Sequence, residues 1–298
     1  MEKTLGLLDA VPYLRSYAGQ CFVIKVGGDL LQQQSARHSV ARDLAVLHRL
    51  GIRTVLVHGG GPQLDAALAR AGIETERVAG RRITSEAAIR EAIREWRGLC
   101  SSDWVSALVN QGEKAVGISG ADGGLLNAVR RPPVVTTTDA GERITVDYGY
   151  VGDVSSVNTA LVESLLSVGT IPVVSPLARG AAGEILNVNA DTVAAHIAVA
   201  LGAAKLLLLT QTPGILRDLD DPTSVLHWTD LGELAELELS GALSGGMRPK
   251  VAAIRMALQG GVPRVHVLDG RVSGALLEEV FTNEGCGTLV VPRREAAS

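Results

Sequence analysis

Short apolar runs alternate along this chain with longer segments whose apolar residues recur at helical spacing, and this alternation restricts the fold more than any single motif. Each run has the length and the turn-residue boundaries of a buried strand. The runs lie at 22–26, 54–57, 115–118, 171–175, 205–210, 265–268 and 287–291, and the main helices are expected at 35–50, 86–109, 192–201, 251–259 and 275–281. Such alternation predicts an α/β fold whose mostly parallel sheet is covered by helices on both faces. No long linker interrupts the 298 residues, so we expect two lobes that share one sheet.

Composition excludes several classes of function. Hydrophobic residues make up 46% of the chain, which indicates a folded protein, and the net charge of −4 argues against nucleic acid as the main partner. No apolar run reaches the roughly 20 residues that span a bilayer, and no signal peptide is evident. The cysteines, Cys21, Cys100 and Cys286, are scattered and form no metal-binding pattern. We therefore expect a cytoplasmic protein with reduced thiols, no membrane contact and no protein-held metal.

A lysine stands near the end of the first strand, just before two glycines. Lys25 is followed by Val26, Gly27 and Gly28, a pattern that fits neither standard nucleotide-binding motif. Adjacent glycines allow a tight turn and a close approach to a ligand, and lysine and backbone amides both donate to anionic oxygen. The stretch is a candidate phosphate site. The alternative is an ordinary turn with the lysine in solvent.

The second strand also ends in glycines. His58 is followed by Gly59, Gly60, Gly61 and Pro62, and then by a helix that ends near residue 71. A helix start offers free N–H groups and a positive dipole end, which together favour an anion. We favour an anion site over a tight turn because three glycines lose more backbone entropy than a plain turn requires.

Polar residues at three further places are candidates for the same site. Asn187, Asn189 and Asp191 alternate, so an extended stretch would put them on one face, although Asp191 could simply cap the following helix. Arg82 precedes a helix capped by Thr84 or Ser85 and could bind a carboxylate or stay solvated. Lys250 follows a second glycine pair at 245–246.

Two segments leave alternatives open. Residues 125–158 read as hairpins, with turns at 139–141 and 147–152, which could form a flap over a substrate or a surface ribbon. Residues 3–18 carry Leu5, Leu8, Val11 and Leu14 at helical spacing, with Pro12 expected to kink or interrupt the helix. That helix could pack on its own domain or on another subunit.

The order of these motifs resembles the amino acid kinase family from about residue 7 to residue 291. The motifs are Lys25-Val-Gly-Gly, His58-Gly-Gly-Gly-Pro, Gly80-Arg-Arg-Ile-Thr, Asn187-Val-Asn-Ala-Asp191, Leu209-Thr followed by Gly214-Ile-Leu, and Gly245-Gly-Met with Pro249-Lys250. The resemblance implies a three-layer αβα sandwich with a mainly parallel sheet and two lobes. Residues 1–19 would form an oligomerisation helix, 20–185 the lobe for the acyl amino acid and the phosphoryl group, and 186–298 the ATP lobe.

Within the family, the motifs are most similar to the branch that phosphorylates the side-chain carboxylate of N-acetyl-L-glutamate with ATP in arginine synthesis. The resemblance implies that Lys25 and Lys250 contact the phosphates and that Asp191 orients both lysines. Gly27, Gly28, Gly59 and Gly60 would donate N–H groups to the phosphoryl group, and Gly59 and Gly60 would also bind substrate. Arg82 and Asn187 would hold its α-carboxylate and acetylated amine.

The nucleotide side carries one departure from the family pattern. The resemblance assigns nucleotide binding to Thr210, Gln211, Gly214, Leu216, Gly245 and Met247, with Mg²⁺ carried mainly by the ATP phosphates. The family usually has Asp where this chain has Gln211, which puts Mg·ATP affinity in question. It also commonly has Asn where this chain has Ala79, so one polar contact to the substrate is absent. Neither change touches the lysines or Asp191, and we expect an active kinase.

The N-terminal segment suggests regulation. Arginine-inhibited members of the family resemble this chain in an extra helix that ends near Pro12-Tyr13, which interlaces dimers into a hexamer. The residues at comparable effector positions are Tyr13, Lys205, His266 and Glu279. We therefore expect inhibition by L-arginine and a homo-oligomer, a hexamer rather than a dimer, with a PII-type signalling protein as a further partner to consider.

Two other functions remain open on sequence. The first is the sister kinase of lysine synthesis, which acts on an α-aminoadipyl group attached to a carrier protein, and the N-terminal helix argues against it. The second is a non-catalytic homologue that responds to arginine or a PII protein. Gln211 gives it some support, while the retention of Lys25, Asp191 and Lys250 argues against it.

Overall fold

A computed structural model describes residues 7–137, 142–218, 221, 223–241 and 247–293, with the side chains of residues 7–10 left out. Its centre is an eight-stranded sheet in the order β14-β16-β15-β13-β1-β2-β10-β5. The strands are β1 (Cys21–Val26), β2 (Arg53–His58), β5 (Ala115–Ser119), β10 (Ile171–Ser175), β13 (Lys205–Thr210), β14 (Trp228–Asp230), β15 (Val265–Asp269) and β16 (Thr288–Val291). Among these neighbours only β15 and β16 pair antiparallel, which confirms the mainly parallel sheet.

Helices cover both faces of this sheet. Helices α8 (Ala190–Ala200) and α10 (Met247–Gln259) bury their apolar residues in one core cluster, with α7 (Ala160–Ser167) beside them. Helices α3 (Gln34–Arg49), α4 (Gly61–Arg70), α6 (Ser101–Val109) and α11 (Ala275–Phe281) contribute to the other cluster. Because side chains alternate along a strand, Phe22, Ile24 and Val26 of β1 belong to the second cluster and Val23 to the first. The αβα sandwich is confirmed, and Lys25 points to the α8 face.

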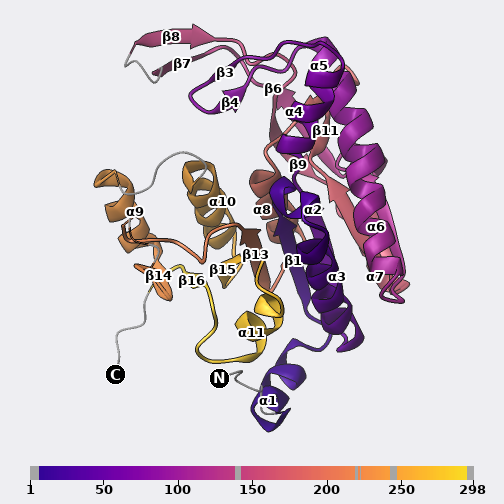
Figure 1. Ribbon diagram of the computed structural model, residues 1–298, viewed down its shortest axis with the longest axis vertical. Coiled ribbons are helices and arrows are strands. Elements are labelled where there is room, and N and C mark those ends of the chain that lie inside the picture. Colours follow the sequence, from indigo (N-terminus) through magenta and orange to yellow (C-terminus); the bar gives the residue numbers. More distant parts are fainter. Residues whose placement is uncertain (1–6, 138–141, 219–220, 222, 242–246, 294–298) are drawn as a thin grey trace.

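Smaller sheets overhang one edge of the sandwich (Figure 1). One has four strands, β12 (Ile185–Asn187), β11 (Leu177–Gly180), β6 (Leu126–Arg130) and β9 (Gly152–Val157). Two hairpins lie beside it, β3 (Arg77–Val78) with β4 (Arg81–Arg82) and β7 (Val134–Thr137) with β8 (Arg143–Val146). The expected hairpins of 125–158 are thus present, although their turn at 139–141 lies outside the described residues.

Two expectations about helices differ from the structure in detail, and one alternative that the sequence left open is excluded. Helix α1 (Leu7–Tyr17) runs through Pro12 without interruption. The helix expected at 86–109 has three parts, α5 (Glu86–Ala92), the π-helical segment η1 (Ile93–Cys100) and α6. Asp191 is not the cap of α8, because Asn189 takes that position and its Oδ1 accepts the amides of Asp191 and Thr192 at 2.9 and 3.1 Å.

Some elements were not expected at all. A short helix α2 (Gly28–Gln32) begins directly after β1, so Gly28 opens a helix. Strands β11, β12 and β14, helix α9 (Leu231–Leu239) and the single turn η2 (Asp122–Gly124) complete the chain.

Ser85, not Thr84, caps α5 by accepting the Ala88 amide at 3.2 Å. In the part of the chain that the structure describes, no helix has the length and apolarity to cross a bilayer.

Candidate active site

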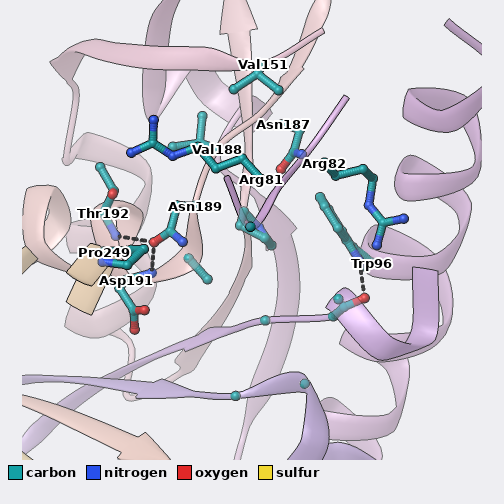
Figure 2. A pocket seen from close by; sticks show the side chains of 18 of the residues that line it. Arg81, Arg82, Trp96, Val151, Asn187, Val188, Asn189, Asp191, Thr192 and Pro249 are labelled. Atoms are coloured by element: carbon teal, nitrogen blue, oxygen red, sulfur yellow. Dashed lines mark hydrogen bonds between the residues drawn. The ribbon is translucent and has the colours of Figure 1, made fainter. Parts of the chain in front are cut away.

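A cavity of about 450 Å³ opens at the carboxyl ends of β1 and β2, the edge where parallel sheets usually bind ligands. Its floor is formed by the two glycine turns, 27–28 and 59–61. Figure 2 shows Asp191 and Pro249 on one side of the cavity, and Arg82 and Trp96 on the other. Residues from five of the six sequence motifs therefore meet here.

Two lysines share one carboxylate at this cavity. Nζ of Lys25 lies 2.9 Å from Oδ1 of Asp191, and Nζ of Lys250 lies 3.2 Å from the same oxygen. All three side chains are buried. Lys25 comes from β1, Asp191 from the first turn of α8 and Lys250 from α10, and α8 packs against both β1 and α10. The fold thus assembles the three residues that the sequence singled out as catalytic candidates.

The charges of these groups depend on one another. Burial opposes ionisation of Asp191, but the ammonium groups of Lys25 and Lys250 outweigh it and hold the pKa of this carboxyl well below its usual range. Burial and repulsion from Lys25 lower the pKa of Lys250, and Asp191 counters both effects. The cluster carries two positive charges against one negative charge, so it favours an additional anion.

The two glycine turns touch. A Cβ on Gly28 would lie 2.9 Å from Cα of Gly60, so only glycine allows the turns to approach this closely. The amide of Gly27 donates to Leu209 O at 3.3 Å and that of Gly59 to Val26 O at 2.8 Å. The amides of Gly28 and Gly60 have no acceptor within the described residues. Of the four expected donors, these two are therefore available to a ligand.

The predicted substrate residues line the same cavity. Arg82 is buried, with its Nη2 2.5 Å from Asp65 Oδ1 and its Nη1 3.2 Å from Thr75 Oγ1. Asn187, at the end of β12, donates to Thr84 Oγ1 at 3.2 Å. Arg77, Arg81 and Arg131 add further positive charge to the lining. The arrangement suits a small anionic molecule.

The expected nucleotide residues that the structure describes do not line this cavity. Thr210 ends β13, and Gln211, Gly214 and Leu216 follow it in an adjoining loop. Met247 opens α10 and packs partly against the core, whereas Gly245 lies outside the described residues. The glycine at 214 is required by packing, because a Cβ there would lie 2.5 Å from Thr288 Oγ1.

Three of the four expected effector residues form a buried chain elsewhere. His266 lies 2.6 Å from Glu279 through Nδ1 and 2.9 Å from Lys205 Nζ through Nε2. Lys205 also sits 5.2 Å above the ring of Tyr17, which packs at 6.0 Å against Tyr13 on α1. Tyr13 itself donates to Asn283 Oδ1.

Trp96 lines the cavity although no motif of the sequence marks it, whereas Tyr148 lines it from the 147–152 turn that could form a flap. Trp96 lies in η1 and its indole nitrogen donates to Gly60 O at 2.7 Å, drawn as the dashed line below Trp96 in Figure 2. An aromatic residue in a helical pattern normally belongs to the core, so the sequence around Trp96 gives no functional signal. In the described ranges no group of three His, Cys, Asp or Glu side chains could hold a metal ion.

Known proteins resemble this chain over most of its length. The model described as "Amino acid kinase family" matches residues 20–269. A Myxococcus xanthus protein named acetylglutamate kinase is 46% identical over 287 residues, which cover 96% of this chain and 93% of that protein.

A solved structure also matches, N-acetylglutamate synthase from Neisseria gonorrhoeae complexed with coenzyme A and N-acetyl-glutamate. The TM-score is 0.80 at 30% identity, and the match covers 97% of this chain but only 63% of the synthase chain. The chain therefore spans less than two thirds of that enzyme's length. The same synthase complexed with coenzyme A and L-arginine matches with a TM-score of 0.78 at 28% identity, over 98% of this chain and 67% of that one.

Proposed function

Because this chain belongs to the amino acid kinase family, we propose that it transfers the γ-phosphoryl group of ATP to the side-chain carboxylate of N-acetyl-L-glutamate, an early step of arginine synthesis. The product is N-acetyl-L-glutamyl 5-phosphate. The observation that carries the proposal is the meeting of Lys25 and Lys250 on Asp191 beside two open glycine amides.

The chemistry requires positive charge rather than a base. A glutamate carboxylate has a pKa of about 4.3, so the acceptor is already a nucleophile at neutral pH. The difficulty is to bring this anion to the polyanionic triphosphate. Lys25, Lys250 and the amides of Gly28 and Gly60 would stabilise the phosphoryl group as it moves between two anions. Asp191 keeps the two lysines together and charged.

The two lobes would divide the substrates between them. We assign residues 20–185 to N-acetyl-L-glutamate and the phosphoryl site, with Arg82 and Asn187 holding the α-carboxylate and acetylated amine. We assign residues 186–298 to ATP, with Thr210, Gln211, Gly214, Leu216, Gly245 and Met247 around the nucleotide. Mg²⁺ would be held mainly by the ATP phosphates. Near them, this chain would place the uncharged amide of Gln211 where the family usually has the carboxylate of Asp. We expect the reaction in the cytoplasm.

A comparison of acceptors tests the choice of substrate. We expect turnover of N-acetyl-L-glutamate at least tenfold faster, as kcat/KM, than of an α-aminoadipyl group linked to a carrier protein; a tenfold ratio is about 1.4 kcal/mol in transition-state binding. Preference for the carrier-linked acceptor would assign the chain to the lysine branch. No turnover of either acceptor would favour a non-catalytic regulator.

We also propose that L-arginine inhibits the enzyme. The support is the buried chain from Lys205 through His266 to Glu279, with α1 and Tyr13 packed next to it, and the arginine complex of the structurally similar synthase. Residues 1–19 would interlace dimers into a hexamer, and a PII-type protein is a further candidate partner. Activity that stays unchanged in millimolar arginine, or a dimeric mass by light scattering, would count against this regulation.

A further inference from the structure

His58, at the end of β2, is held between the first glycine of the turn and the start of α6. It is fully buried, and its Nδ1 lies 2.8 Å from Gly59 O while its Nε2 lies 3.0 Å from Ser101 Oγ. A carbonyl oxygen can only accept, so Nδ1 carries the proton and Nε2 accepts from the Ser101 hydroxyl. Burial lowers the pKa of His58 to about 4, which keeps this neutral form throughout the physiological range.

Trp96 holds the next carbonyl of the same turn. Its Nε1 donates to Gly60 O at 2.7 Å, and this oxygen also accepts the Leu64 amide at 3.0 Å, the first bond of α4. The indole ring lies so close that a Cβ on Gly60 would overlap its Cδ1. Two buried side chains thus act on two successive carbonyls.

The π-helical segment explains why both contacts come from one helix. Trp96 lies within η1, and Ser101 follows directly after it at the start of α6. Backbone bonds in a π-helix join residues five apart, which brings Trp96 and Ser101 onto one face of the helix. That face packs on the glycine turn. π-Helical turns occur preferentially at functional sites.

Holding a carbonyl also fixes an amide. In a planar trans peptide the C=O of one residue and the N–H of the next point in opposite directions. His58 therefore orients the N–H of Gly60, and Trp96 orients the N–H of Gly61. Neither of these two N–H groups has an acceptor within the described part of the chain, and Gly60 and Gly61 both line the cavity.

We propose that His58 and Trp96 are positioning residues, which fix two peptide planes so that the N–H groups of Gly60 and Gly61 point at the anionic oxygens of the reaction. This inference rests on the proposed kinase function for the identity of the anion. Preorganised amide donors act most strongly on charge that develops during the reaction. Loss of the orientation should lower kcat more than it affects the KM for ATP.

Trp96→Phe tests the indole contact, and the chain offers a matched control. Trp104 is buried in α6, and its Nε1 has no hydrogen-bond partner among the described residues. Trp104→Phe removes an equal number of atoms without removing a hydrogen bond. We expect Trp96→Phe to lower kcat roughly tenfold and Trp104→Phe to leave kcat unchanged. Equal effects of the two substitutions would overturn the role of Trp96.

Two substitutions at His58 test the roles of its two ring nitrogens separately. The amide nitrogen of asparagine can take the place of Nδ1, whereas that of glutamine reaches the place of Nε2. We expect His58→Asn to keep most of kcat and His58→Gln to lose roughly tenfold. The reverse order would show that the Ser101 contact, and not the Gly59 carbonyl, is what matters.

A spectroscopic measurement keeps the inference separate from the kinase proposal. The ¹⁵N–¹H resonances of Gly60 and Gly61 should shift in Trp96→Phe and His58→Gln but not in Trp104→Phe. They report on the peptide planes even if the wild-type protein makes no acyl phosphate, in which case only the proposed function fails. Glycine resonances that are unchanged in all variants would overturn the inference itself.

Discussion

Lys25 and Lys250 reach the same carboxylate oxygen from segments more than two hundred residues apart in sequence, at 2.9 and 3.2 Å from Oδ1 of Asp191. Two buried ammonium groups repel each other, and Asp191 is the charge that allows both to remain. The site therefore concentrates positive charge where a phosphoryl group is expected to move between two anions.

Asp191→Asn should leave the two lysines facing each other without compensation. We expect the free energy of unfolding to fall by about 3 kcal/mol and kcat by roughly 10²-fold or more. Chemical denaturation and steady-state kinetics measure the two effects. Asp43→Asn is the control, because Asp43 is equally buried but lies away from the cavity and should lose stability without losing kcat. A fully active Asp191→Asn enzyme would contradict the charge argument.

Lys250→Ala should act mainly on kcat. The ammonium group serves charge that develops during transfer, so its loss should lower kcat more than it raises either KM. Initial rates with each substrate varied in turn provide the test. A large rise in the KM for N-acetyl-L-glutamate at constant kcat would mean that the lobes are assigned the wrong way round.

Arg82→Lys should act mainly on the acceptor. The guanidinium already binds Asp65 and Thr75, which fixes its plane beside the cavity. Lysine keeps the charge but loses the planar fork that suits a carboxylate. The KM for N-acetyl-L-glutamate should rise roughly tenfold, with kcat and the KM for ATP changed little. An effect confined to ATP would disprove the assignment of Arg82.

Because the pKa of Lys205 is lowered by folding, the free energy of unfolding should rise with pH. Burial and the nearby Arg264 lower the pKa of Lys205 from 10.5 to about 8, against the opposing effect of Glu279. Between these two values the unfolded chain binds more protons than the folded one, so stability rises with pH across this window. The gain should be on the order of 2 kcal/mol. Denaturation from pH 7 to pH 10.5 should show the rise in wild type and lose it in Lys205→Met; an equal rise in both would refute the assignment.

Ala79 should be a site of backbone strain within the β3–β4 hairpin. Its φ of 48° is the single positive value found outside glycine in the described chain, and it lies in the turn between β3 and β4. This conformation costs a residue with a Cβ about 1 kcal/mol. Ala79→Gly should therefore stabilise the protein by up to that amount. Ala71, with a φ of −82°, is the control, and Ala71→Gly should destabilise. Destabilisation by both changes would show that no strain is relieved at residue 79.

The parallel sheet could be predicted from sequence because its strands are apolar runs buried on both faces. Strand β4 consists of Arg81 and Arg82 alone, and no hydrophobic period can mark an element of that kind. Likewise Ile93–Cys100 keeps an amphipathic pattern, so nothing distinguishes its π-helical turn from the α-helix on either side. The tertiary packing determines the conformation of such segments.

The site could be predicted only in part for a related reason. Lys25 and Asp191 stand in distinctive glycine- and asparagine-rich motifs, and the family resemblance linked them to Lys250. Trp96 stands in an ordinary helical pattern, and its hydrogen bond to Gly60 depends on how η1 packs against a turn 36 residues away. Contacts of that kind exist only in three dimensions.

The formation of an acyl phosphate tests the central claim most directly. Purified protein would be incubated with ATP, Mg²⁺ and N-acetyl-L-glutamate in the presence of hydroxylamine, which traps an acyl phosphate as a hydroxamate. We predict hydroxamate and ADP in equal amounts, dependent on N-acetyl-L-glutamate and formed roughly 10²-fold or more slowly by Asp191→Asn. ADP release without hydroxamate, or no reaction at all, would contradict the proposal that this chain phosphorylates the side-chain carboxylate of N-acetyl-L-glutamate.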